Sequence, residues 1–140
     1  MSAQWRRWVY DKIRLWGPLF PLLPQDQIFA AGSLQVPPAD RPFMHIRFED
    51  TTPGLIPEVS LTRLSLWVHD APGSYLGIET ILREARTALV GADAQVGQVR
   101  DLASGVAVVW QGESGDLSNP DYGTILRFSS YDLHGKDGIT

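Results

Sequence analysis

Three residues in one short stretch, His69, Asp70 and Ser74, carry the side chains of a hydrolase catalytic triad. A working triad needs a nucleophile, a base and an orienting carboxylate that converge in space beside an oxyanion hole. The spacing of these three residues does not favour such convergence. We therefore expect His69 to lie at the end of a strand and Ser74 to cap a helix. A small hydrolase that uses His69 or nearby loop carboxylates is kept as an alternative.

Metal and phosphate chemistry have equally weak signals. His45, His69 and His134 would form a metal site only if three strands aligned them. The segment 113–121 holds three carboxylates, but it lacks the ligand order and the terminal glutamate of a calcium loop. The chain has no cysteine and no glycine-rich phosphate-binding motif. We therefore predict no catalytic residue, no metal and no cofactor, and we predict that the protein is not an enzyme.

The composition is that of one globular domain. The chain has 140 residues, of which 44% are hydrophobic and 20% charged, enough to form a core of its own. The net charge of −4 is uneven, because residues 1–16 carry +3 and the remainder carries −7. A domain with this acidic charge is expected to bind DNA poorly in a sequence-independent way, although it could surround DNA without binding it. No apolar run approaches the ~20 residues of a membrane-spanning helix.

Residues 2–16 are predicted to form an amphipathic helix. Its apolar side chains share one stripe at helical spacing: Trp5, Trp8, Val9, Ile13 and Trp16. In the simplest interpretation this stripe packs on the domain's own sheet. Because tryptophan is enriched at protein interfaces, Trp5, Trp8 and Trp16 are also candidates for contact with a neighbouring subunit. A basic helix lying on a membrane surface is disfavoured, since four basic residues are few.

Residues 17–42 are predicted to form a proline-rich connector. They contain six of the ten prolines, namely Pro18, Pro21, Pro24, Pro37, Pro38 and Pro42. A regular element cannot persist for long through such a segment. We expect it to cover an edge of the core or to reach a partner, with the apolar residues 28–31 as its anchor.

Residues 43–135 are predicted to form the core of a single α+β domain. Hydrophobic alternation predicts four strands, over 43–49, 58–69, 106–112 and 122–131, and helical spacing predicts a helix over 76–90.

Two irregular features are expected in this core. A bulge near residues 62–63 would explain a change of phase in the second strand. Residues 111–123 are expected to be a long polar loop, either solvated or ordered on a partner. The fold is then a small, mostly antiparallel sheet flanked by two helices, in the order α-β-β-α-β-β.

Within this order of elements, three stretches resemble one protein family. They are Trp67-Val-His-Asp-Ala-Pro-Gly-Ser-Tyr75, Trp110-Gln-Gly-Glu-Ser-Gly-Asp116 and Asp121-Tyr-Gly-Thr124. Residues 43–135 thereby resemble the tail terminator, or tail completion, proteins of long-tailed bacteriophages. The resemblance implies a structural virion protein at the head-proximal end of the tail, assembled in the host cytoplasm. The proline-rich connector departs from the family's leaner pattern.

The resemblance also implies a set of partners. The subunit would close into a homo-oligomeric ring, expected to be a hexamer, that caps the tail tube protein and meets the head–tail connector protein. DNA would pass through the lumen without specific binding, and no membrane is involved. A head-closure or connector protein of similar size is the nearest alternative. The candidate contacts with a subunit or the tail tube are Trp5, Trp8, Trp16, Glu113, Asp116, Asp121 and Tyr122.

Overall fold

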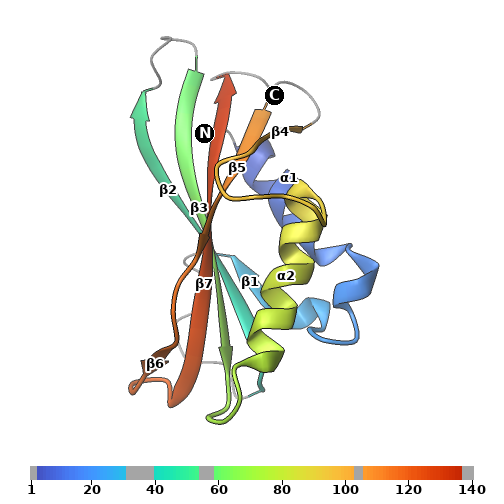
Figure 1. The fold of residues 1–140 in the computed structure, drawn as a ribbon, viewed down its shortest axis with the longest axis vertical. Helices are drawn as coiled ribbons and strands as arrows, with labels where there is room; N and C mark the ends of the chain where they lie inside the picture. The colour runs from blue at the N-terminus through green and yellow to red at the C-terminus, as the bar shows by residue number, and fades with distance from the viewer. Residues whose placement is uncertain (1–2, 31–39, 54–58, 103–105, 137–140) are drawn as a thin grey trace.

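The computed structural model of the protein describes residues 3–30, 40–53, 59–102 and 106–136. Two helices, α1 (Ala3–Arg14) and α2 (Leu76–Val90), pack on the same face of one open sheet (Figure 1). The strands are β1 (Ile28–Ala30), β2 (Phe43–Pro53), β3 (Val59–Asp70), β4 (Val99–Leu102), β5 (Val106–Glu113), β6 (Leu117–Asn119) and β7 (Thr124–Lys136). The predicted α+β class is confirmed.

The strand order is β1-β2-β3-β7-β5-β4, and β6 pairs with the start of β7. The long strands β2, β3 and β7 form an antiparallel centre, whereas β1 pairs with β2 in parallel. Strands β1 and β4 therefore lie at opposite edges of the sheet (Figure 1).

The hydrophobic core lies between the sheet and the two helices. Leu64, Leu66 and Val68 alternate along β3 and are fully buried. They meet a stripe of buried α2 residues at helical spacing, namely Ile78, Ile81, Leu82, Ala85 and Leu89. Removing a fully buried leucine from such a core costs about 2–5 kcal/mol, because a cavity remains. This packing fixes which face of the sheet the helices cover and which face they leave open.

The predicted connector is more regular than its prolines indicate. It contains two short 3₁₀ helices, η1 (Gly17–Leu19) and η2 (Gln25–Gln27), followed by β1. Leu19, Leu23 and Ile28 are buried in the core, and the Tyr10 hydroxyl donates to the Ile28 carbonyl at 2.8 Å. Ile28 thus anchors the segment as the sequence predicts, although it does so inside an unpredicted strand. Residues 31–39, in the second half of the connector, lie outside the described part.

The prediction of a long polar loop over residues 111–123 is wrong, because the range contains the end of β5 and all of β6. Strand β5 continues to Glu113 through an irregularity between Trp110 and Gly112, where Gly112 has a φ of 110°. Strand β6 then takes the place of β5 beside β7. The polar composition of this segment gives no hydrophobic alternation from which a strand could be predicted. The pairing of β6 with β7 uses backbone groups rather than an apolar face. Strand β4 was not predicted either.

A bulge was predicted near residues 62–63 of the second strand, β3. The structure has it instead on the neighbouring strand, β2. The register shifts between Asp50 and Pro53 of β2, opposite Thr62 and Ser60 of β3. The extra residue belongs to β2, which also runs past residue 49, where the predicted strand ends. Proline is tolerated at such a bulge because no ladder hydrogen bond is needed there.

Candidate functional site: the β6 strap and the uncovered sheet face

Residues 113–123, which we call the β6 strap, connect the two sides of the sheet at the start of β7. The first part of the strap contacts α2 on the helix-covered side. The last part contacts aromatic side chains on the side that the helices leave uncovered. Four predicted contact residues, Glu113, Asp116, Asp121 and Tyr122, belong to this segment.

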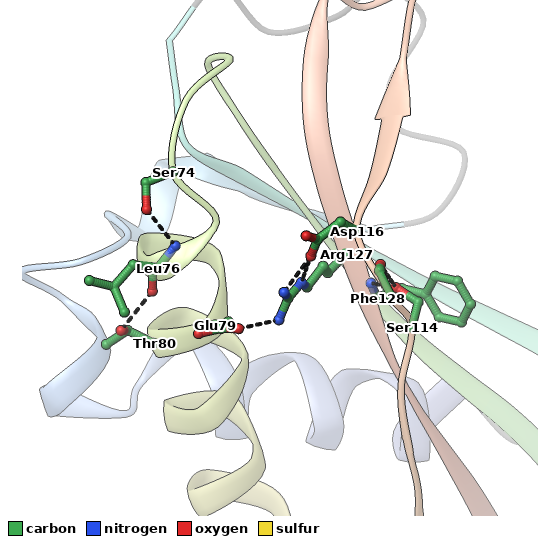
Figure 2. Close-up of polar contacts among 9 residues, drawn as sticks. Ser74, Leu76, Glu79, Thr80, Ser114, Asp116, Arg127 and Phe128 are labelled. Carbon is green, nitrogen blue, oxygen red and sulfur yellow. Dashed lines mark hydrogen bonds and ion pairs between the residues drawn. The ribbon is translucent and has the colours of Figure 1, made fainter.

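Arg127 of β7 holds the first part of the strap, as Figure 2 shows. Its Nε donates to Asp116 Oδ1 at 2.6 Å, and its Nη1 donates to a carboxylate oxygen of Glu79 on α2. The guanidinium also lies 5.4 Å from the centre of the Tyr75 ring. Although burial acts in the opposite direction, the hydrogen bonds to Asp116 and Glu79 raise the pKa of Arg127. Two charge-assisted bonds from one cation tie the strap to the helix.

Neutral hydrogen bonds reinforce this attachment. The Ser114 N–H donates to the Phe128 carbonyl at 2.8 Å, and the Phe128 N–H donates back to Ser114 Oγ at 3.0 Å (Figure 2). The Tyr75 hydroxyl donates to the Leu117 carbonyl at 2.8 Å. The strap is therefore held by contacts within a single chain.

Glu113, the last residue of β5, is opposite Ser129 of β7 and lies on the helix-covered side of the sheet. Burial raises the pKa of its carboxyl group, while Arg86 and Arg127 act in the opposite direction. The Arg86 guanidinium lies 4.3 Å from the centre of the Trp110 ring, and Trp110 Nε1 donates to Ser129 Oγ at 3.0 Å. Glu113 is exposed, and Glu79 acts with burial to raise its pKa.

The last part of the strap turns onto the uncovered face. Asn119 Oδ1 accepts the N–H groups of Asp121 and Tyr122 at 3.0 and 3.2 Å, which closes a turn. The Tyr122 ring centre lies 5.4 Å from that of His69, and Arg41 Nη2 donates to the Tyr122 carbonyl at 3.2 Å. Asp121 is exposed beside this contact.

His69 is a buried, neutral ring at this end of the sheet. It stacks on Phe43 with 4.6 Å between ring centres, and its Nδ1 is 2.8 Å from Thr124 Oγ1. Burial, followed by His45 and Arg41, lowers the pKa of His69 to about 4. The ring is therefore uncharged near pH 7, and its contacts are structural.

The other two residues of the triad pattern have local partners. Asp70 Oδ1 accepts the Ala71 N–H at 2.8 Å, and Ser74 Oγ accepts the N–H of Leu76, the first residue of α2, at 3.1 Å (Figure 2). His69 thus lies near the end of β3, as the sequence predicts. The predicted cap is off by one residue, because Tyr75 is the N-cap of α2 and Ser74, which precedes it, accepts the Leu76 N–H.

The uncovered face carries a second aromatic group and a groove. Trp67 and Phe128 stack with 4.3 Å between ring centres, and the Arg47 guanidinium lies 5.7 Å from the Trp67 ring centre. Beside them is a groove of about 260 Å³, lined by His45, Arg47, Trp67, His69, Asn119, Tyr122 and Leu126. Burial and then Arg47 lower the pKa of His45.

The three tryptophans near the N-terminus differ in position, because Trp5 and Trp8 lie on α1 whereas Trp16 follows its last residue, Arg14. Trp8 is half-buried against the core, with Lys12 Nζ 5.7 Å from its ring centre. Trp16 Nε1 donates to Glu84 Oε2 of α2 at 3.1 Å. Trp5 lies on α1, but its side chain is outside the described part. The contact of these residues with another subunit stays a prediction.

His45, His69 and His134 do not come together at a common site. His134 of β7 is opposite Leu61, whereas His69 is opposite Leu126 at the far end of the same strand pair. Within the described ranges, no group of three His, Cys, Asp or Glu side chains could hold a metal ion. No helix among the described residues has the length and apolar character to cross a membrane.

Sequence reasoning missed Arg127, Arg41 and the Trp67–Phe128 pair. A signal for Trp67 was present, because it is a large aromatic residue out of phase with the buried Leu64 and Val68. Arg127 gave no such signal, since its two partners come from distant segments.

No protein-family model matches the chain, and comparison with curated proteins finds no match. Its function must therefore be argued from the residue patterns and this geometry.

Proposed function

We propose that the protein is a tail terminator subunit, which closes into a ring on the phage tail tube and joins the tube to the head connector. The observation that best supports this, besides the sequence resemblance, is that the two edges of the sheet present different surfaces. A closed ring forms when one surface of each subunit docks on a different surface of the next.

The β4 edge presents exposed apolar side chains. Val99 of β4 is 61% exposed, and Val96 in the preceding turn is 58% exposed. Asp93, in the turn that directly follows α2, is also exposed. An apolar patch with an acidic neighbour is a surface that docking would bury favourably.

The opposite edge presents a groove between α1 and β2. It measures about 370 Å³ and is lined by Arg6, Arg7, Tyr10, Ala30, Ile46 and Phe48. The Arg6 guanidinium lies 5.5 Å from the Phe48 ring centre, so the apolar floor has a basic rim. The β4 edge of one copy would place valines on this floor and Asp93 near the rim of the next copy.

The charge distribution suits the proposed lumen. Outside residues 1–16 each subunit carries −7, and the basic helix would be placed against the acidic part of a neighbour. A ring of six such subunits, the expected number, is acidic as a whole. DNA passing through it would meet few cations to bind its phosphates.

Native mass across a concentration series, with negative-stain images of the same samples, tests the proposal. We expect a closed ring, formed alone or on added tail tubes. Val99→Lys should prevent closure, whereas Leu76→Lys, at a residue 68% exposed at the start of α2, should not. A strict monomer that also fails to bind tail tubes would contradict the proposal.

The order of binding separates this function from head closure. A tail terminator binds purified tail tubes before any head is present. A subunit that binds DNA-filled heads first and ignores tubes would instead be a head-closure or connector protein.

A further inference from the structure

The groove of about 260 Å³ on the uncovered face has a distinctive chemistry. Its lining contains Arg47, two imidazoles, an indole and an amide, and none of its lining side chains is acidic. Arg41 lies close by, where it donates to the Tyr122 carbonyl. The positive charge here comes from Arg47 and Arg41, because burial lowers the pKa of both imidazoles. The exposed Asp121 is the next residue to Tyr122.

Two nitrogen atoms of the lining have unused hydrogen-bonding capacity. Trp67 Nε1 and His45 Nε2 are buried and have no hydrogen-bond partner within the described residues. An indole N–H can only donate, so a partner for Trp67 must be an acceptor. A buried donor without an acceptor costs free energy. Both atoms are closed to solvent, so an incoming oxygen recovers that free energy only when a neighbouring side chain moves aside.

The geometry favours a small anion over a stacked base. One side of Trp67 is taken by Phe128, and the Arg47 guanidinium lies over the same indole. Base stacking on single strands needs an open aromatic face, which Trp67 does not offer. The groove is also smaller than the ~300–1,000 Å³ typical of cofactor pockets.

We propose that this groove binds an aspartate or glutamate side chain of a partner protein, with the carboxylate paired to Arg47 and accepting the Trp67 N–H. Arginine and carboxylate match in charge and geometry, and the aromatic walls would contact the methylene groups of the side chain. This site is distinct from both edges of the sheet, so it does not depend on ring closure.

Nuclear magnetic resonance of the full ¹⁵N-labelled chain tests this site directly. The indole N–H signal of Trp67 is assigned with Trp67→Phe, and the probe is an acetylated tri-glutamate peptide with an amidated end. We expect a saturable downfield shift of that signal, and no shift with the tri-glutamine peptide. No saturable response to the glutamate peptide would overturn the proposal.

Two arginines on the same face provide a matched comparison. Arg47→Gln should weaken the peptide by about 10-fold or more, because it removes the charged partner. Arg63→Gln removes the same charge from a residue outside the groove, whose Nε lies 3.3 Å from Asp132 Oδ1, and should leave binding unchanged. Equal weakening by both variants would show a general charge effect and refute the site. A response to inorganic phosphate without one to the peptide would also refute it.

Discussion

Trp67 of β3 and Phe128 of β7 lie directly opposite one another and stack on the face of the sheet that neither helix covers. Cross-strand aromatic pairs stabilise a sheet beyond the area that they bury. This pair therefore stabilises the centre of the sheet from its open side, whereas the core stabilises it from the other.

A double-mutant cycle measures this contribution. Trp67→Ala and Phe128→Ala should show a coupling energy of about 0.5–1.5 kcal/mol in urea unfolding. Trp67→Ala combined with Val109→Ala, on the same face but not in the stack, should be additive within about 0.5 kcal/mol. Additive behaviour of the Trp67 and Phe128 variants would show that the stack contributes no coupling.

Removing Arg127 should loosen the β6 strap. Arg127→Gln loses the ion pairs to Asp116 and Glu79, and we expect it to lower the free energy of unfolding by about 1–3 kcal/mol. Hydrogen exchange of the β6 amides should accelerate. Arg63→Gln, which removes an arginine 53% exposed, should cost less than about 1 kcal/mol. The attachment would be refuted if exchange in β6 were as slow as in the wild type.

Stability should depend on pH through His69. The pKa of His69 falls from 6.5 to about 4 on folding, so the unfolded state takes up a proton first as the pH drops. The contribution of neutral His69 to the free energy of unfolding is fully present above about pH 6.5. It is lost progressively toward pH 4, by up to about 3 kcal/mol. Unfolding in urea at several pH values measures this slope.

A matched variant isolates the contribution of His69. His69→Phe keeps a ring for stacking on Phe43 but has no titrating group. Its stability should change less over the same pH range, with a remainder from His45, whose pKa is also lowered. An unchanged slope would assign the pH dependence to other groups.

The Trp16 indole should contribute to folding through its N–H. Trp16→Phe loses the hydrogen bond to Glu84, and we expect a loss of about 0.5–1.5 kcal/mol in the unfolding free energy of the isolated subunit. Leu15→Ala, at a neighbour 69% exposed, should stay within about 0.5 kcal/mol of the wild type. If Trp16→Phe left the unfolding free energy unchanged but prevented formation of the proposed ring, the residue would act at an interface instead.

Hydrophobic spacing was enough to predict the long elements of the fold. The alternation of Leu64, Leu66 and Val68 and the helical spacing over 76–90 identify β3 and α2, because each pattern continues over several periods. Strands β1, β4 and β6 have only three or four residues, too few for a period to emerge. Their positions follow from pairing with distant strands, which one sequence does not reveal.

The candidate site was predictable only in part. The carboxylates of residues 113–121 stand out in the sequence, but their attachment does not. Arg127 of β7 contacts Asp116, which lies just before β6, and Glu79 of α2, which is far away in the chain. The sequence indicates charge at each position, whereas the choice of partner is decided by how α2 and β7 pack.

The β6 strap is anchored near both ends, through Asp116 on one side of the sheet and Tyr122 on the other. A segment held in this way has little freedom to change its length, since one added residue would displace one of the two contacts. Over evolutionary time, substitutions at the exposed Ser118 and Pro120 would leave both anchors in place, whereas insertions and deletions would be selected against. Length, more than composition, is therefore the property that the two contacts constrain in this segment.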